Sequence, residues 1–187
     1  KRQTRGIGAM IAGGFVAGGA TVVVSSRKAD ACEQTAQRLG RHGTCIGIAA
    51  DLSSEQGAQG LADAVAERYD HVDVLVNNAG ATWGVPLAEH DTASWSRVLD
   101  LNVQGVFHTT KFFRALLEAG ATADDPSRVI NIGSIDGIHT PIMETFSYSA
   151  SKAAVHQLTR HLSLIHISEP TRPLYISYAV FCLKKRR

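Results

Sequence analysis

The chain has 187 residues, 44% of them apolar and 19% charged, which suits one packed domain and excludes a disordered chain. The formal net charge of +2 gives no reason to expect a nucleic-acid partner, and no apolar run reaches the ~18–20 residues that a membrane span requires. Three cysteines without metal-ligand spacing argue against a disulfide framework and against a metal site. Because no secretory leader is visible, we expect a cytoplasmic protein without a membrane partner.

Strand-like and helix-like segments alternate along the chain. Short β-branched runs, which are typical of buried parallel strands, lie at residues 21–25, 44–50, 72–76 and 128–132. Helical patterns lie at residues 29–39, 93–119 and 147–160, and a further helix follows a capping box predicted at Ser53 and Gln56. That helix carries an apolar stripe formed by Ala58, Leu61, Ala62 and Val65. This order predicts an α/β fold of Rossmann type, with a doubly wound parallel sheet covered by helices on both faces.

Residues that suit a nucleotide follow the predicted strands, where an open parallel sheet binds its ligands. At the start of the chain a glycine-rich turn precedes a helical run and lets the backbone approach a pyrophosphate; it consists of Thr4, Arg5, Gly6, Ile7 and Gly8. After the third strand, small residues let a ribose pack close to the backbone, and the run reads Asn77, Asn78, Ala79 and Gly80. An ordinary glycine-rich or Asn/Gly turn is the alternative at both places.

Asp51, with Leu52 behind it, follows the second strand. Its carboxylate can accept a hydrogen bond from an adenine amino group. An acid that simply stabilises a helix N-terminus is the alternative.

Tyr148 and Lys152 carry the strongest chemical signal in the sequence. Their spacing places both side chains on one face of a helix, one turn apart. A lysine charge beside a phenol favours the phenolate and lowers the pKa of the phenol, which would prepare Tyr148 as a general acid or base. Ser134 lies upstream, at the end of the fourth predicted strand. A Tyr/Lys pair on a helix surface with a coincidental serine is the alternative.

Together these motifs resemble the short-chain dehydrogenase/reductase family, over residues 4–161. The resemblance implies that Tyr148 donates a proton to the substrate carbonyl oxygen and that Ser134 hydrogen-bonds the same oxygen. Lys152 would bind the nicotinamide ribose and lower the pKa of Tyr148, and Asn102 would hold a water that links Lys152 to solvent. The cofactor-binding positions that it implies are Arg5, Gly6, Ile7, Gly8, Ser26, Arg27, Asp51, Leu52, Asn78, Ala79, Gly80, Tyr148 and Lys152.

The choice of cofactor depends on the end of the first predicted strand. Family members that prefer NAD(H) place an acid there, whereas this sequence reads Ser25, Ser26, Arg27 and Lys28. Arg5 points to the same region in the family. Cations around a ribose 2′-phosphate favour NADP(H) over NAD(H), because guanidinium groups match phosphate geometry. A solvated basic loop is the alternative.

Within the family the sequence is most similar to 3-oxoacyl-(acyl carrier protein) reductase-like members. This implies reduction of a 3-oxoacyl thioester to its 3-hydroxy form, on a small-molecule or acyl-carrier-bound substrate. Oxidoreduction of a sugar acid or another small alcohol is the enzymatic alternative, and a dinucleotide-binding regulator without turnover is the alternative outside catalysis. Family members assemble as tetramers, here through the helices predicted at 93–119 and 147–160.

Both ends of the chain depart from the family pattern. The family's first strand is missing, and Arg2 stands where the first glycine of the turn is expected, so residues 1–3 look foreign to the domain. Residues 162–187 resemble the conceptual translation of a transposase-type sequencing adapter, and we therefore expect no strand of the domain in the apolar run at 175–183. We expect a sheet truncated at both ends, and low solubility and low activity for the 187-residue chain.

Overall fold

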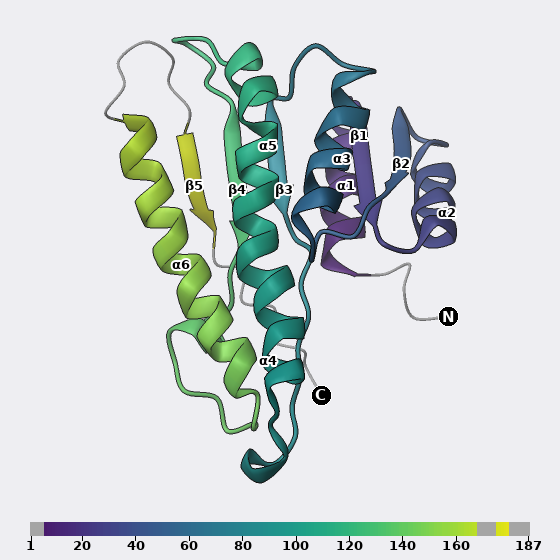
Figure 1. Cartoon of the computed structure of the whole chain (residues 1–187). Coiled ribbons are helices and arrows are strands. Elements are labelled where there is room, and N and C mark those ends of the chain that lie inside the picture. The colour runs from purple at the N-terminus through teal and green to yellow at the C-terminus, as the bar shows by residue number, and fades with distance from the viewer. Residues whose placement is uncertain (1–5, 168–174, 180–187) are drawn as a thin grey trace.

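The computed structural model of the protein describes residues 6–167 and 175–179 (Figure 1). The α-helices are α1 (Ile7–Ala17), α2 (Ala29–Leu39), α3 (Glu55–Ala66), α4 (Thr92–Leu99), α5 (Gly105–Gly120) and α6 (Phe146–Ile167). The strands are β1 (Val22–Ser26), β2 (Cys45–Ala49), β3 (Val74–Asn77), β4 (Arg128–Ile132) and β5 (Tyr175–Ala179). Three shorter turns are η2 (Leu87–Glu89), η3 (Asp100–Gln104) and η4 (Ile135–Gly137). The alternation of strands and helices confirms the predicted α/β class.

All strand pairs are parallel, but the sheet is in two parts. β1 pairs with β2, and Val22 lies opposite Cys45. β3, β4 and β5 form the second part, in which Val74 lies opposite Arg128. Among the described residues no strand joins β1 to β3, although the two parts lie beside each other (Figure 1). This division agrees with the expected absence of the family's first strand.

Alternate residues of β1 contact two different helix layers, as in a strand that is covered on both faces. Val23 packs against the core formed by α3 and α5, whereas Val22 and Val24 pack against the core formed by α1 and α2. Within the described residues, the helices therefore cover β1 from both faces, as the doubly wound prediction requires.

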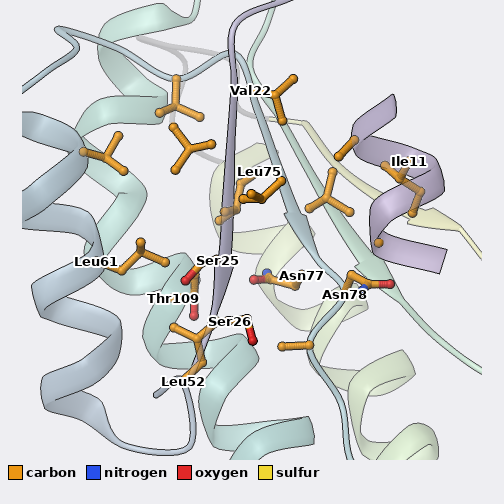
Figure 2. Close-up of a pocket in the computed structure, with 18 of the residues that line it drawn as sticks. Ile11, Val22, Ser25, Ser26, Leu52, Leu61, Leu75, Asn77, Asn78 and Thr109 are labelled. Atoms are coloured by element: carbon orange, nitrogen blue, oxygen red, sulfur yellow. The ribbon is translucent and has the colours of Figure 1, made fainter. Parts of the chain in front are cut away.

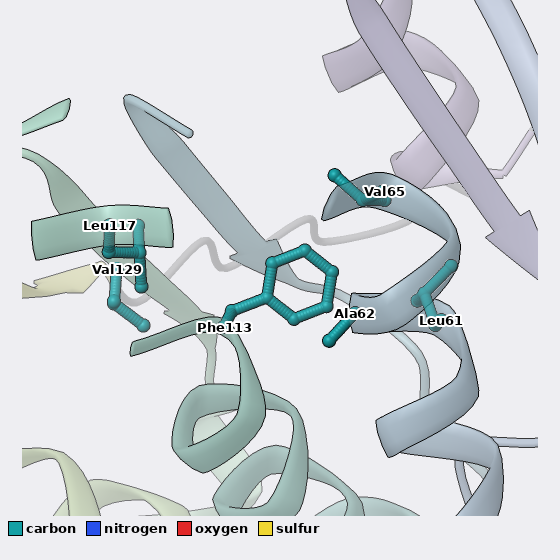
Figure 3. Packing of buried hydrophobic residues seen from close by; sticks show 6 residues of the cluster. All are labelled: Leu61, Ala62, Val65, Phe113, Leu117 and Val129. Atoms are coloured by element: carbon teal, nitrogen blue, oxygen red, sulfur yellow. The ribbon is translucent and has the colours of Figure 1, made fainter. Parts of the chain in front are cut away.

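The larger core lies between α3, α5 and the sheet (Figure 3). Its buried members are Leu61, Ala62, Val65, Phe113, Leu117 and Val129. The predicted apolar stripe of α3 supplies the first three, and the remaining stripe residue, Ala58, is also buried. Burial of a side chain such as Phe113 stabilises the fold by about 1.5–3 kcal/mol, which fixes the position of α5 and of the turn before it.

Two local predictions are wrong. The cap of α3 is Ser54, whose Oγ accepts a 3.1 Å hydrogen bond from the backbone N–H of Gly57, and not the predicted pair of Ser53 and Gln56. The single helix predicted at 93–119 is interrupted, because η3 is a π-helical turn between α4 and α5. Such widened turns are often found at functional sites.

The C-terminal segment also differs from expectation. Helix α6 continues past residue 160 to Ile167, and β5 lies in the run where we expected no strand. β5 pairs in parallel with β4, and Tyr175 lies opposite Arg128. Residues 1–5, 168–174 and 180–187 lie outside the described residues. The expectation that residues 1–3 are foreign to the domain and the predicted cofactor contacts of Thr4 and Arg5 therefore also lie outside them. None of the helices in the described part of the chain combines the length and apolarity of a membrane span.

Candidate active site

Lys152 lies on the inner side of α6 and is only 6% exposed. Its Nζ donates a 2.7 Å hydrogen bond to the backbone carbonyl oxygen of Ile132, the last residue of β4. Burial lowers the pKa of its ammonium group below the ordinary lysine value. One turn earlier on the helix, the ring centroid of the half-buried Tyr148 lies 5.8 Å from this Nζ. The phenol and the ammonium group are therefore neighbours, as their spacing predicts.

Asn102 lies in the π-helical turn η3 and is 1% exposed. Its Oδ1 accepts a 2.8 Å hydrogen bond from the N–H of Ala81, and its Nδ2 donates to the carbonyl oxygen of Ala81 at 2.9 Å. The same Nδ2 donates to Oγ of Ser151 at 2.8 Å. Asn102 thus connects the loop after β3 to the helix that carries Lys152.

Ser134 follows β4 after one residue, Gly133, and caps the short turn η4. Its Oγ accepts a 3.2 Å hydrogen bond from the backbone N–H of Asp136. The turn packs against α6, where a Cβ added to Gly137 would lie 2.6 Å from the carbonyl carbon of Lys152. A glycine at this position therefore allows the loop that carries Ser134 to approach the helix that carries Tyr148.

Buried polar side chains join the strands to the helices behind this site. Nδ2 of Asn77 donates to Oδ1 of Asn131 at 2.8 Å and to Oγ1 of Thr110 at 3.2 Å. Nδ2 of Asn131 in turn donates to Oγ1 of Thr159 at 2.9 Å. The sequence did not indicate Asn131, Thr110 and Thr159 as members of this network. These bonds fix β3, β4, α5 and α6 relative to one another.

The glycine-rich turn leads into α1. Gly6 is the N-cap residue of this helix, and its first turn contains no acidic residue. No side chain of the described residues caps it, so its first backbone N–H groups are open to an anion. A Cβ added to Gly8 would lie 2.6 Å from Nδ2 of Asn78, so this glycine permits a close approach between α1 and the loop after β3.

Cations and an acid meet at the ends of β1 and β2. Ser26 ends β1, and the exposed Arg27 and Lys28 follow it. After β2, Asp51 accepts hydrogen bonds from the hydroxyl of Ser53 at 2.7 Å and from its N–H at 3.1 Å. These bonds from Ser53, with a smaller effect of the Arg27 charge, hold the pKa of Asp51 below its ordinary value. The carboxylate therefore organises its own turn, whether or not it also contacts a nucleotide.

The predicted residues form two groups. Seven of the cofactor candidates line one cavity: Gly6, Gly8, Ser26, Arg27, Leu52, Asn78 and Ala79 (Figure 2). The second group lies around Asn102 and Lys152. Gly80 belongs to it, because a Cβ added there would lie 3.4 Å from Oδ1 of Asn102 and 4.0 Å from Nζ of Lys152. Ile7 and Asp51 are not among the residues that line the cavity.

Comparison with known proteins assigns the family. The model of the short chain dehydrogenase family matches residues 3–169. The chain therefore belongs to this family, whose members are oxidoreductases.

Individual proteins are similar to most of the chain. The rhamnolipids biosynthesis 3-oxoacyl-(acyl-carrier-protein) reductase of Pseudomonas aeruginosa is 47% identical over 160 residues, which cover 86% of this chain and 62% of that protein. The galactitol 2-dehydrogenase (L-tagatose-forming) of Cereibacter sphaeroides is 38% identical and is covered over 60% of its length. A solved Pseudomonas aeruginosa RhlG/NADP active-site complex is 44% identical with a TM-score of 0.88, over 95% of this chain and 68% of that one. The chain thus spans under two thirds of the length of the reductase and of the galactitol dehydrogenase.

Proposed function

We propose that this chain carries the catalytic centre of an NADPH-dependent reductase that converts a carbonyl compound, by preference a 3-oxoacyl thioester, into a secondary alcohol. The observation that carries the proposal is the placement of the buried Lys152 beside Tyr148, on a helix packed against the turn that begins at Ser134. The 47% identity to a 3-oxoacyl-(acyl-carrier-protein) reductase supports the substrate class.

Each residue has a separate role in this proposal. The hydroxyl of Tyr148 donates its proton to the carbonyl oxygen of the substrate, and Oγ of Ser134 donates a hydrogen bond that orients the same oxygen. Lys152 holds its ammonium group beside the phenol and contacts the nicotinamide ribose. Asn102 holds the water through which the proton lost by Tyr148 is replaced from solvent. When bound, NADPH supplies the hydride for the carbonyl carbon.

The residues at the ends of β1 and α1 fit a phosphorylated dinucleotide. The N-terminus of α1 offers open N–H groups without an acid, which favours a pyrophosphate. Arg27 and Lys28 follow β1, and the last residues of this strand include no acid. Cations without an acid at this strand end favour a 2′-phosphate over a free 2′-hydroxyl. Asn78 and Ala79, beside Gly8, would take the ribose side of the cofactor. The solved relative in complex with NADP supports the same choice over NAD(H).

A second candidate function is oxidoreduction of a polyol, a sugar acid or another small alcohol. The 38% identity to a galactitol 2-dehydrogenase favours it. A dinucleotide-binding regulator without turnover is disfavoured, because binding alone needs no proton donor at Tyr148.

Oxidation of NADPH by the full-length gene product tests these alternatives. We expect reduction of acetoacetyl thioesters, with a preference for NADPH over NADH. Turnover of sugar acids or of galactitol, measured as oxidation of the alcohol by NADP⁺, should be slower. Tight binding of NADPH without turnover of any carbonyl would rule out the enzyme. Faster turnover of polyols than of thioesters would instead establish the second candidate. The proposal includes a cytoplasmic location and assembly as a tetramer. Light scattering on the same protein checks the tetramer.

A further inference from the structure

Two loops leave the carboxyl end of the sheet and adjoin the proposed active site (Figure 1). The first loop, residues 81–91, begins at Ala81, whose backbone N–H and carbonyl oxygen are both bonded to the side chain of Asn102. The second loop, residues 138–145, follows the turn η4 and ends at α6, shortly before Tyr148. A displacement of either loop therefore alters the space beside the residues proposed for the reaction.

The second loop meets the first at Glu144. Oε1 of Glu144 accepts a 3.3 Å hydrogen bond from the backbone N–H of Leu87. The backbone carbonyl oxygen of Glu144 lies 3.3 Å from Nε2 of His90. Because a carbonyl oxygen can only accept, Nε2 is the donor in this bond. One residue of the second loop thus binds two residues of the first.

Packing beside Glu144 joins the same two segments. The rings of His90 and Phe146 make an edge-to-face contact, with their centroids 5.2 Å apart. A Cβ added to Gly84 would lie 3.0 Å from Cγ2 of Thr145 and 3.5 Å from the carbonyl oxygen of Glu144, so glycine lets the two backbones approach closely. We call these contacts, together with the two hydrogen bonds of Glu144, the loop clasp.

Most of both loops is exposed. Residues 82–84 and 86–89 of the first loop and 142–144 of the second are exposed to solvent. Outside the loop clasp, the guanidinium group of Arg97 in α4 lies 4.6 Å from the ring centroid of Trp83 and supports the first loop. Exposed segments with few buried contacts open at low cost in free energy, so the loop clasp determines how closely the two loops approach each other.

The loop clasp lies apart from the cofactor cavity. None of residues 82–91 and 138–146 is among the described residues that line this cavity. The loops adjoin Asn102 and Tyr148 instead, at the end of the site where the proposed reaction takes place. Opening the loop clasp should therefore change the fit of the substrate and leave the affinity for NADPH unchanged.

We propose that Glu144 is a positioning residue for the substrate. By tying the first loop to the second, it holds the two sides of the substrate entrance at a fixed separation, and the carbonyl compound binds between them, beside Tyr148. The inference rests on the proposed function, because it assigns the loop clasp to the substrate of that reaction. Contacts that bind the ground state and the transition state equally well affect KM and not kcat, so loss of the loop clasp should raise KM.

Kinetics of the full-length gene product test this role. Glu144→Ala removes the acceptor for the N–H of Leu87, whereas Glu144→Gln keeps an acceptor oxygen. We expect Glu144→Ala to raise KM for an acetoacetyl thioester by about threefold to tenfold and to leave kcat within about twofold of the parent value. Glu144→Gln should restore the parent KM. Glu89→Ala is the control, because it removes an exposed carboxylate of the first loop that forms no hydrogen bond or ion pair with the described residues.

A second variant tests the other hydrogen bond of the loop clasp. His90→Phe keeps an aromatic ring beside Phe146 and removes the Nε2 donor to the carbonyl oxygen of Glu144. Combined with Glu144→Ala it removes both hydrogen bonds, and KM should rise further than in either single variant. If the double variant does not fold, the single variants still decide.

Hydrogen exchange measures the loop clasp without reference to activity. Glu144→Ala and Glu144→Gln have the same sequence over residues 84–91, so their exchange rates can be compared directly. Exchange in this segment should be faster in Glu144→Ala, whereas exchange in α3, at residues 55–66, should be equal in the two variants.

Three results would overturn the proposal. The first is a KM of Glu144→Ala equal to that of Glu89→Ala, and the second is a fall in kcat at unchanged KM. The third is equal exchange of residues 84–91 in Glu144→Ala and Glu144→Gln, which would show that the carboxylate does not hold the first loop. A parent protein that turns over no carbonyl compound would refute the proposed function and with it the substrate role, whereas the exchange experiment would still show whether Glu144 ties the loops together.

Discussion

Nζ of Lys152 donates a 2.7 Å hydrogen bond to the carbonyl oxygen of Ile132, and this bond joins α6 to the end of β4. The bond places a buried cation at the end of β4, two residues before Ser134 in the sequence. The positions of the proposed proton donor and of the serine that would orient the carbonyl are thereby coupled through one side chain. An isolated surface Tyr/Lys pair would not have this arrangement.

The buried cation predicts a pH dependence of stability. Burial lowers the pKa of Lys152 in the folded state, so the unfolded chain holds this proton more strongly. Between the lowered pKa and the ordinary lysine value, the unfolded state therefore binds more protons, and stability should rise with pH. Urea unfolding as a function of pH should show this rise in the parent protein and its loss in Lys152→Met. Equal slopes for the two proteins would refute the assignment to Lys152.

The π-helical turn predicts that Asn102 is a positioning residue. Asn102→Ala removes the bonds to Ala81 and Ser151 and leaves their buried groups without these partners, so we expect a loss of about 1–3 kcal/mol in the free energy of unfolding. Ser151→Ala, which removes one of these bonds, should cost less. Chemical denaturation measures both, and a cost of Asn102→Ala no larger than that of Ser151→Ala would contradict the role.

The contact between η4 and α6 predicts a steric effect at Gly137. Gly137→Ala pushes a methyl group against the backbone of Lys152, and overpacking of this kind costs about 1–3 kcal/mol. Because the turn carries Ser134, activity should also fall. Gly14→Ala is the control, since a Cβ there meets nothing within 4 Å and alanine in a helix interior stabilises by about 0.5–1 kcal/mol. Thermal unfolding that moves in the same direction for both variants would argue against the packing explanation.

The basic end of β1 predicts the cofactor preference. Arg27→Ala should weaken NADPH binding by about tenfold to a hundredfold, because a charge-assisted hydrogen bond to phosphate contributes about 1.5–3 kcal/mol, and should leave NADH binding nearly unchanged. Arg41→Ala removes an exposed arginine from the loop after α2 and serves as the control. Isothermal titration with both cofactors provides the comparison. Equal losses for NADPH and NADH would mean that Arg27 does not contact a 2′-phosphate.

Several features could be predicted from the sequence because they depend on local pattern. The helix Ala29–Leu39 and the strand Arg128–Ile132 have the predicted bounds, since Gly40 ends the first and an apolar β-branched run defines the second. The spacing of Tyr148 and Lys152 likewise determines their proximity on one helix. These features depend on residues close together in the chain.

Other features depend on tertiary contacts or on choices between similar residues. The π-helical turn at Asp100–Gln104 lies between α4 and α5, and the apolar pattern that predicted one helix over residues 93–119 did not indicate it. Ser53 and Ser54 are both good capping residues, and only the path of the backbone after Asp51 decides between them. The contact between Asn77 and Asn131 depends on the register of β3 against β4, which the sequence does not show.

Substitution of Tyr148 by phenylalanine tests the central claim most directly. Phenylalanine keeps the ring beside Lys152 and removes only the hydroxyl that donates the proton. In the full-length gene product, NADPH oxidation with an acetoacetyl thioester should fall by at least about 10²–10⁴-fold, while the affinity for NADPH stays close to that of the parent enzyme. Retention of turnover within a few-fold of the parent rate by Tyr148→Phe would contradict the account.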